Sequence, residues 1–89
     1  MRNRADSNQN EIVEALRGIG ASVLVLSQVG GGCPDLLVGW YGKNLLFEVK
    51  SPTGDLRQAQ KDFFDNWQGR AYIVRSVDEV MELINDRMA

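Results

Sequence analysis

The chain has 89 residues, of which 44% are hydrophobic and 25% are charged, as expected for a folded protein with one small domain over residues 1–89. It contains no histidine and a single cysteine, Cys33, so one chain can form neither a His/Cys zinc site nor a histidine-activated nucleophile. The 10 basic and 12 acidic residues give a net charge of −2, which does not by itself indicate a nucleic-acid-binding surface. Any enzymatic chemistry must therefore come from carboxylates, lysine, amides and an oxygen-ligated metal.

Neither a membrane span nor a signal peptide is indicated. The sequence has no run of about 18 apolar residues, and residues 1–10 are polar. A lone cysteine also excludes an internal disulfide, which is typical of a reducing compartment. We therefore expect a cytoplasmic protein without a membrane partner. A domain this small buries only about 60% of its unfolded surface, so a partner subunit is expected to add to its stability.

The first half of the chain predicts one helix and three strands. Asp6 or Ser7 can cap a helix that runs to about Arg17. Its apolar face consists of Ile12, Val13, Leu16 and Ile19. Residues 22–26 form a nearly continuous apolar run, which predicts a buried strand. After three glycines, strands are predicted at residues 35–40 and 45–50, joined as a hairpin by turn residues 41–44.

The second half predicts helix, strand and helix. The helix covers residues 56–67 and its inward face consists of Leu56, Ala59, Phe63, Phe64 and Trp67. A strand follows at residues 71–74, and Ser76 with Glu79 forms a capping box for a last helix that ends near Asn85. The predicted order is therefore α-β-β-β-α-β-α, an α/β fold in which a mixed sheet carries helices and the chain ends in a helix.

Two acidic residues and a lysine stand at predicted strand ends. Glu48 and Lys50 point to the same face because side chains alternate along a strand. If the two strands pair as a hairpin, Asp35 comes near Glu48. Two adjacent carboxylates repel each other unless a cation lies between them, and oxygen ligands suit Mg²⁺ or Mn²⁺. Such a metal could activate a water and polarise a phosphate. The alternative interpretation is a solvated Glu–Lys pair.

Gln60 lies within the apolar stripe of helix 56–67, where an unpaired amide is unfavourable. Two interpretations are open. The amide can be a core group bonded to backbone, or it can belong to the site formed by the carboxylates. Trp67 on the same stripe is predicted to be a core residue, and Cys33 a small packing residue.

The residues around these acids are similar to a known family. Pro34-Asp35, twelve further residues and Glu48-Val49-Lys50 resemble the signature of the PD-(D/E)XK nucleases. Residues 31–39, residues 46–50 and Gln60 resemble the virus-type replication–repair nuclease (VRR-NUC) branch, in particular its small stand-alone phage or prophage members. The likeness covers nearly the whole chain. It implies a restriction-endonuclease-like PD-(D/E)XK core with the order αβββαβ.

The resemblance implies that Asp35 and Glu48 are metal ligands, together with the carbonyl of Val49. It implies that Lys50 positions the water or stabilises developing charge, and it places Gln60 beside the site. The protein would then be a Mg²⁺- or Mn²⁺-dependent endodeoxyribonuclease that needs no small-molecule cofactor. It would act as a homodimer on branched DNA such as four-way (Holliday) junctions, in the bacterial host of a phage or prophage.

Many relatives carry a further site glutamate on the first helix. Here Glu11 lies at the edge of the apolar stripe, whereas Asn8 and Gln9 face inward more directly. Gln9 occupies the position at which some junction-resolving relatives have that glutamate. Both Glu11 and Gln9 therefore remain candidates for the site.

Three basic residues are candidate contacts to DNA. Arg57 and Lys61 lie one helical turn apart and could hold a phosphate, and Arg75 follows the last predicted strand. The alternative function is a catalytically silent DNA-binding or assembly module on the same fold. A restriction-type enzyme that reads a base sequence needs recognition elements for which 89 residues leave little room.

Overall fold

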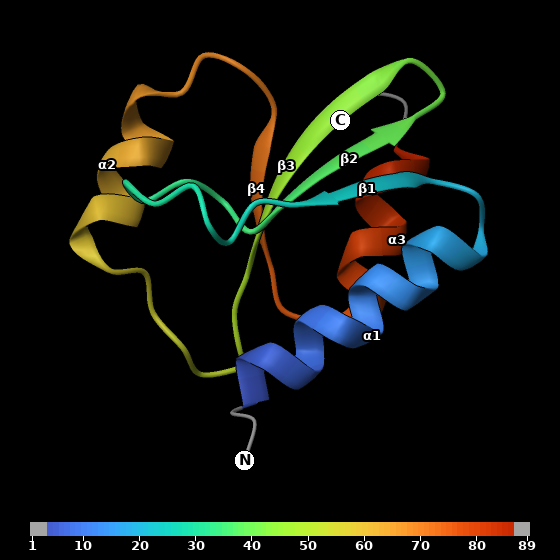
Figure 1. Ribbon diagram of the computed structural model, residues 1–89, viewed down its shortest axis with the longest axis horizontal. Coiled ribbons are helices and arrows are strands. Elements are labelled where there is room, and N and C mark those ends of the chain that lie inside the picture. The colour runs from blue at the N-terminus through green and yellow to red at the C-terminus, as the bar shows by residue number, and fades with distance from the viewer. Residues whose placement is uncertain (1–3, 87–89) are drawn as a thin grey trace.

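The helices and strands follow one another in the order predicted from the sequence. The computed structural model describes residues 4–86. Its elements are α1 (Arg4–Gly18), β1 (Ser22–Val25), β2 (Leu36–Trp40), β3 (Lys43–Val49), α2 (Gln58–Asn66), β4 (Ala71–Val74) and α3 (Val77–Asn85). The predicted α/β class, with an αβββαβ core, a mixed sheet and a C-terminal helix, is confirmed (Figure 1).

The sheet has four strands in the order β1-β2-β3-β4. β1 pairs with β2 and β2 with β3 in antiparallel fashion, whereas β3 and β4 are parallel. The β2–β3 hairpin turns on Tyr41 and Gly42, whose φ angles of 46° and 79° are those of a tight turn that follows the strand twist. A parallel pair needs a crossover connection, and α2 lies in that connection, beside the sheet.

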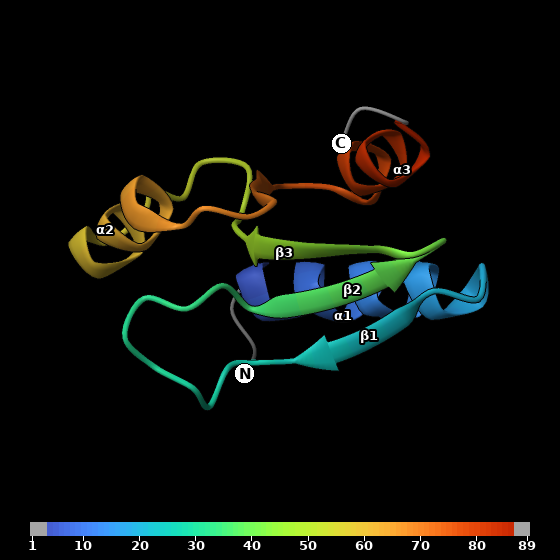
Figure 2. The same ribbon diagram turned by 90° about the horizontal axis from the view of Figure 1, so that it is seen from above.

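One face of the sheet carries the hydrophobic core. Val38, Leu45 and Phe47 point to this face from the two central strands and are fully buried. α1 and α3 cover it and contribute Ile12, Leu16, Val80 and Ile84 to the same cluster (Figures 1 and 2). The apolar faces predicted for the first and last helices therefore meet on this side of the sheet.

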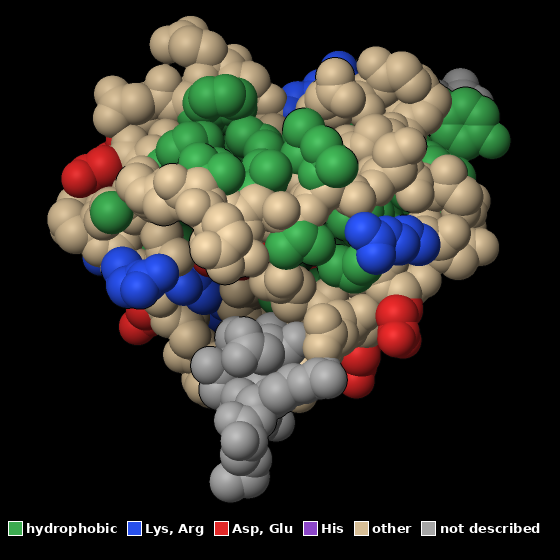
Figure 3. All heavy atoms as spheres, in the orientation of Figure 1, with side chains coloured by type: hydrophobic (Ala, Val, Ile, Leu, Met, Phe, Trp, Pro, Cys, Tyr) green, Lys and Arg blue, Asp and Glu red, His purple; other side chains and the backbone are tan. Residues whose placement is uncertain are grey.

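The opposite face of the sheet is open at the edge strand β1, whereas Leu46 on β3 is buried there. Leu24, Leu37 and Leu46 lie side by side across β1, β2 and β3 and point to this face. Figure 2 shows α1 behind the strands, and no helix of the described chain in front of β1 and β2. Hydrophobic side chains gather on this side of the molecule (Figure 3). The prediction of a buried strand at residues 22–26 was therefore wrong, because β1 is an edge strand and Leu24 is 60% exposed.

Smaller differences concern the ends of helices. α1 extends back to Arg4, so Asp6 and Ser7 lie inside it instead of capping it. Ile19 lies beyond the end of α1 and is exposed, and Trp67 lies beyond the end of α2 and is 48% exposed instead of buried in the core. At α3, Ser76 Oγ accepts from the Glu79 amide as predicted, but the Glu79 carboxylate accepts from the backbone of Arg75.

Within residues 4–86, none of the helices has the length and apolar character needed to cross a membrane.

Candidate active site

The hairpin brings Asp35 and Glu48 together on the face of the sheet opposite the core. Leu36 pairs with Phe47, so the residues next to them, Asp35 and Glu48, lie opposite each other. Asp35 Oδ2 accepts a hydrogen bond of 2.8 Å from the backbone N–H of Val49. This bond fixes the direction of the Asp35 carboxylate at the C-terminal end of β3.

Glu48 is a buried carboxylate, and one of its two oxygens has no hydrogen-bond partner among the described residues. The residue is 2% exposed. Its Oε2 lies 3.1 Å from Gln60 Nε2, which donates to it, and 3.6 Å from Lys50 Nζ. Oε1 is buried and has no hydrogen-bond partner among the described residues. A buried charged oxygen without a partner is strongly unfavourable, which points to a missing cation or proton.

The pKa of Glu48 reflects this setting. Burial raises the pKa of Glu48 to about 7, and the negative charge of the neighbouring Asp35 acts in the same direction. Lys50 opposes the shift without cancelling it. Burial, followed by the charges of Glu48 and Asp35, also raises the pKa of the Cys33 thiol. Cys33 therefore stays protonated in this acidic surrounding.

Gln60 connects the lysine to the carboxylate. Its oxygen accepts from Lys50 Nζ at 2.9 Å and from the backbone N–H of Arg57 at 2.8 Å. Both interpretations of Gln60 therefore apply. The residue is 5% exposed and bonded to backbone, and its amide also contacts Glu48 and Lys50. The apolar stripe of α2 was the signal that singled it out.

A cleft of about 360 Å³ opens in front of Asp35, between the loop that follows β1 and the start of α2. Its lining includes Asp35, Gln60, Arg57 and the glycine run. Gly32 has a φ of +78°, and a Cβ at this position would lie 2.1 Å from the carbonyl oxygen of Ala59. The glycine thus lets the loop touch the first turn of α2 and close one wall of the cleft.

α1 contacts this region through an amide. Asn8 Nδ2 donates to the carbonyl of Lys50 at 2.9 Å and to the carbonyl of Arg75 at 2.8 Å, which ties α1 to the ends of β3 and β4. Gln9 is half-buried and Glu11 is exposed. Sequence reasoning noted that Asn8 faces inward but missed this clamp, because its acceptors are backbone carbonyls far along the chain.

The three basic candidates differ in their surroundings. Arg57 is exposed and lines the cleft, and Lys61 is exposed on the next turn of α2. Arg75 Nη1 donates to the carbonyls of Ser51 and Gly54 at 2.6 and 2.7 Å. Its guanidinium therefore holds the turn that follows β3, a role without any signal in the sequence.

The donors present fit a hard divalent cation. Residues 4–86 contain no group of three or more Asp, Glu, Cys and His side chains around one point, so side chains alone do not complete a metal shell. Asp35 and Glu48 supply two carboxylates, the partnerless Oε1 among them, and the Val49 carbonyl is the expected third oxygen. Mg²⁺ is commonly bound in this way, by one or two carboxylates with water and phosphate oxygens filling the other positions.

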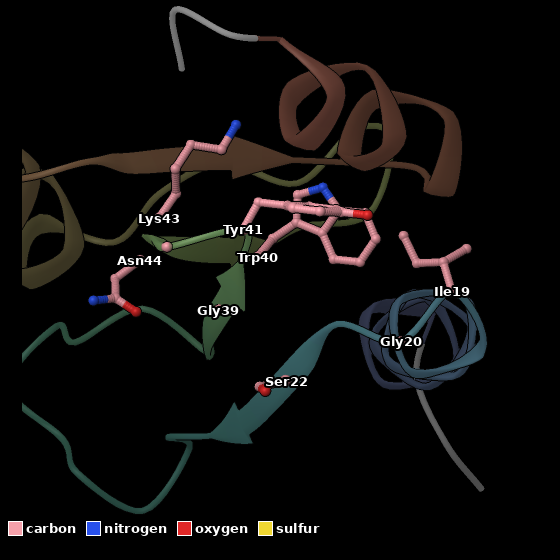
Figure 4. Close-up of a pocket in the computed structure, with 9 residues that line it drawn as sticks. Ile19, Gly20, Ser22, Gly39, Trp40, Tyr41, Lys43 and Asn44 are labelled. Carbon is pink, nitrogen blue, oxygen red and sulfur yellow. The ribbon is translucent and has the colours of Figure 1, made fainter.

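A second hollow, of about 550 Å³, lies at the far end of the sheet around the 41–42 turn (Figure 4). None of the described residues that line it is acidic. Its one cationic side chain, Lys43, donates to the carbonyls of Ile84 and Asp86 at 3.2 and 3.0 Å. The acidic side chains and the lysine that could form a catalytic site therefore lie at the Asp35 end of the sheet.

Comparison with known proteins agrees with this geometry. The family model described as the VRR-NUC domain matches residues 2–79. The chain belongs to the VRR-NUC domain family. A solved structure of a protein described as "VRR_NUC domain" is similar in fold, with a TM-score of 0.75 and 22% identity over 97% of this chain and 99% of that chain. A search of curated proteins found no match.

VRR-NUC is a nuclease domain family whose members generally use divalent metals, which supports a nuclease role for this chain and DNA as its substrate. The family resemblance inferred from residues 31–50 is thereby confirmed. In this VRR-NUC domain, Asp35, Glu48, Lys50 and Gln60 form one connected cluster at the end of the β2–β3 hairpin.

Proposed function

We propose that this VRR-NUC domain is a Mg²⁺- or Mn²⁺-dependent endonuclease that hydrolyses phosphodiester bonds in DNA. The observation that carries the proposal is the buried Oε1 of Glu48, which lacks a partner among the described residues and lies beside a second carboxylate. A cation between Asp35 and Glu48 would remove both the repulsion and the unpaired oxygen.

In the proposed site, Asp35, Glu48 and the carbonyl of Val49 hold the metal. When bound, the metal supplies positive charge that polarises the phosphate and lowers the pKa of an attacking water. Lys50 stabilises the negative charge that develops on the phosphate oxygens or orients the water. Hydrolysis joins the water oxygen to phosphorus and breaks the bond to the leaving oxygen, which takes up a proton.

Amide side chains keep these groups in position. Gln60 fixes Lys50 relative to Glu48, and Asn8 fixes the backbone of Lys50. Among the candidates on α1, the half-buried Gln9 is better situated than the exposed Glu11 to add a contact at the site. Both are included in the proposal, and single substitutions of each distinguish them.

Basic residues near the cleft would contact the DNA backbone. Arg57 directly precedes α2 and lines the cleft, and Lys61 is exposed on the helix, so they are suited to bind phosphates on either side of the cut. Arg75 would contribute through the 51–54 turn, which its guanidinium holds next to Lys50.

We further propose that the natural substrate is branched DNA, such as a four-way junction, and that the active form is a homodimer. Two sites related by a two-fold axis suit a substrate with paired strands. The small size of the domain supports the same conclusion, because single DNA-binding modules bury only roughly 600–1,000 Å². The resemblance to stand-alone members supports a phage or prophage origin.

The test is a cleavage panel. Pure protein is mixed with Mg²⁺ or Mn²⁺ and with labelled linear, flap and four-way DNA, together with the variants Glu48→Ala and Asp35→Ala. Cleavage that requires both carboxylates, with preference for the four-way DNA, is expected. Asp62→Ala, which changes an exposed acid on α2, is the matched control and should cleave normally. The proposal fails if no DNA is cut or if cutting survives Glu48→Ala.

One observation favours the alternative of a catalytically silent DNA-binding or assembly module. The described site has only two carboxylates, and Lys50 lies 3.6 Å from one of them, where it already offsets part of their charge. Titration calorimetry with Mn²⁺ on the wild type and on Asp35→Ala separates the two functions. Binding that the substitution removes supports the nuclease, and the same absence of heat in both supports the silent module.

A further inference from the structure

The segment that links β3 to α2 has no helix or strand of its own. It covers residues 50–57 and connects the strand that carries Glu48 to the helix that carries Gln60. Figure 1 shows this connection leaving β3 and passing the N-terminal end of α1 before it reaches α2. A segment without regular backbone pairing keeps one conformation where other groups bind its polar atoms. The groups that bind this segment therefore help to place Lys50 relative to Gln60.

Lys50 lies where β3 and β4 stop pairing. Its N–H donates to the carbonyl of Val74 at 3.0 Å. If the parallel ladder continued, the next donor to the Lys50 carbonyl would be the N–H of Ser76, but Ser76 leaves the sheet and caps α3. Asn8 Nδ2 donates to this carbonyl instead, at 2.9 Å, and also to the carbonyl of Arg75 at 2.8 Å. One side-chain amide on α1 thus replaces the ladder where the two strands diverge.

The same contacts orient the carbonyl of Val49, the expected third metal oxygen. Within a strand, the N–H and C=O of one residue point to the same side of the chain. The N–H of Val49 donates to Asp35, so the Val49 carbonyl also points to the Asp35 side. The N–H of Lys50 belongs to the same peptide unit and points the opposite way, to Val74. Because Asn8 binds the carbonyl of Lys50, the peptide units on both sides of Lys50 are held.

Arg75 holds the next part of the segment. Its Nη1 donates to the carbonyls of Ser51 and Gly54 at 2.6 and 2.7 Å. The N–H of Gly54 donates to the carbonyl of Ser51 at 3.2 Å, so the guanidinium binds both ends of a single turn. Hydrogen bonds from a charged donor are stronger than those from a neutral one. Since the carbonyl of Arg75 is bound by Asn8, the two side chains form one series of contacts from α1 to the 51–54 turn.

We propose that Asn8 and Arg75 are positioning residues that hold the Lys50 end of β3 in the conformation that the site needs. Through them the Val49 carbonyl stays on the side of the carboxylates, and the Lys50 ammonium stays in place. The inference rests on the proposed function, because it assumes that a cation binds between the two carboxylates. Neither side chain is among the described residues that line the cleft in front of Asp35. Both therefore act through the backbone that they bind.

The test is the affinity for Mn²⁺, measured by titration calorimetry without DNA at a temperature at which every variant is folded. Asn8→Leu removes both donors, and α1 itself is not weakened because Leu is a better helix former than Asn. We expect this substitution to lower the Mn²⁺ affinity about tenfold, as for the loss of groups that orient metal ligands.

Arg75→Gln separates position from charge. Loss of a positive charge from this end of the sheet would by itself favour a bound cation, so charge alone predicts a higher Mn²⁺ affinity. Loss of the contacts to Ser51 and Gly54 predicts a lower one. We expect the affinity to fall about tenfold here too. A higher or unchanged affinity for Arg75→Gln would contradict a positioning role for Arg75.

Val80→Ala is the matched control for stability. Val80 on α3 is fully buried in the core, so its truncation destabilises the fold without touching the candidate site. Its Mn²⁺ affinity should equal that of the wild type. An equal loss of affinity in Val80→Ala and Asn8→Leu would show that Asn8 acts through stability alone and would overturn the proposal.

Cleavage kinetics distinguish this inference from the proposed function. Asn8→Leu should lower kcat and leave the KM for DNA unchanged, because Asn8 lies outside the cleft lining. A wild type that binds Mn²⁺ but cuts no DNA contradicts the proposed nuclease, and a lower Mn²⁺ affinity in both variants then still supports the positioning role. Wild-type Mn²⁺ affinity and cleavage in both variants overturn the positioning role and leave the nuclease standing.

Discussion

Gln60 and Glu48 are joined through their side chains: Nε2 of the amide donates to Oε2 of the carboxylate at 3.1 Å. The oxygen of the same amide accepts from Lys50 Nζ and from the backbone of Arg57. One buried carboxamide therefore sets the direction of the carboxylate, the place of the ammonium and the start of α2. With Oε2 held in this way, Oε1 is the oxygen left for a metal.

Replacing Gln60 should damage activity more than stability. Gln60→Leu suits the apolar stripe of α2 but removes the partner of Lys50 and the donor to Glu48. We expect the single-turnover cleavage rate to fall by about 100-fold and Mn²⁺ affinity by about tenfold, as for the loss of groups that orient metal ligands. Rapid-quench cleavage and titration calorimetry measure the two effects.

The control for Gln60 lies on the same helix. Gln58 Nε2 donates to Asp62 on the exposed side of α2, so Gln58→Leu should cleave DNA at the wild-type rate. Equal rates for Gln60→Leu and Gln58→Leu would show that the buried amide does not position the site.

The glycine run offers a matched pair of substitutions. Ala at Gly32 needs a φ of +78° and places its Cβ 2.1 Å from the carbonyl oxygen of Ala59, whereas Ala at Gly31 needs a φ of +64° but meets nothing within 4 Å. Gly31→Ala should therefore destabilise by about 1 kcal/mol, and Gly32→Ala by about 2 kcal/mol or more. Urea unfolding measures both, and equal losses would mean that the contact with α2 is unimportant.

The convergence of Asp35 and Glu48 could be predicted from sequence because a hairpin allows few alternatives. Side chains alternate between two faces, so the predicted hairpin brings Asp35 near Glu48 on one face. The exact register, with Asp35 opposite Glu48, comes from a turn at residues 41–42 that is tighter than the predicted turn at 41–44. Gln60 was found for a similar reason, since helical periodicity decides which side of α2 it occupies. Local geometry is sufficient for both.

Which strands of the sheet are covered by helices could not be predicted in this way. The apolar run at residues 22–26 has the same composition whether or not a helix covers it, and Leu24 proved to be exposed. The contacts of Asn8 and Arg75 were also hidden, because their acceptors are backbone carbonyls as far as 67 and 24 positions away, and every residue offers such a carbonyl. Long-range contacts to backbone leave no mark in the pattern of side chains.

The raised pKa of Glu48 predicts how stability depends on pH. Its pKa rises from 4.5 to about 7 on folding, chiefly through burial and then through Asp35. Between these values the folded protein binds more protons than the unfolded chain, so the metal-free protein should lose stability as pH rises from about 4.5 to 7. Glu48→Gln stays neutral and should melt several degrees above the wild type at pH above 7 in EDTA, with the gap closing in acid.

The control for this titration is Glu82→Gln, which changes an exposed acid on α3. Its melting temperature should follow the wild-type profile across the whole pH range. Parallel profiles for the wild type and Glu48→Gln would contradict a raised pKa at Glu48.

The salt dependence of DNA binding should show whether the basic residues at the start of α2 contact phosphates. Arg57 lines the cleft and Lys61 is exposed one turn further on, so each is expected to neutralise one phosphate. Arg57→Ala and Lys61→Ala should each weaken binding about equally for any DNA sequence and lower the slope of log affinity against log salt by about one. Fluorescence anisotropy in EDTA measures this without cleavage.

Lys43→Ala is the control: that ammonium is held by carbonyls at the end of α3, so its removal should leave the slope unchanged. A slope that responds equally to all three substitutions would mean that DNA does not run along α2.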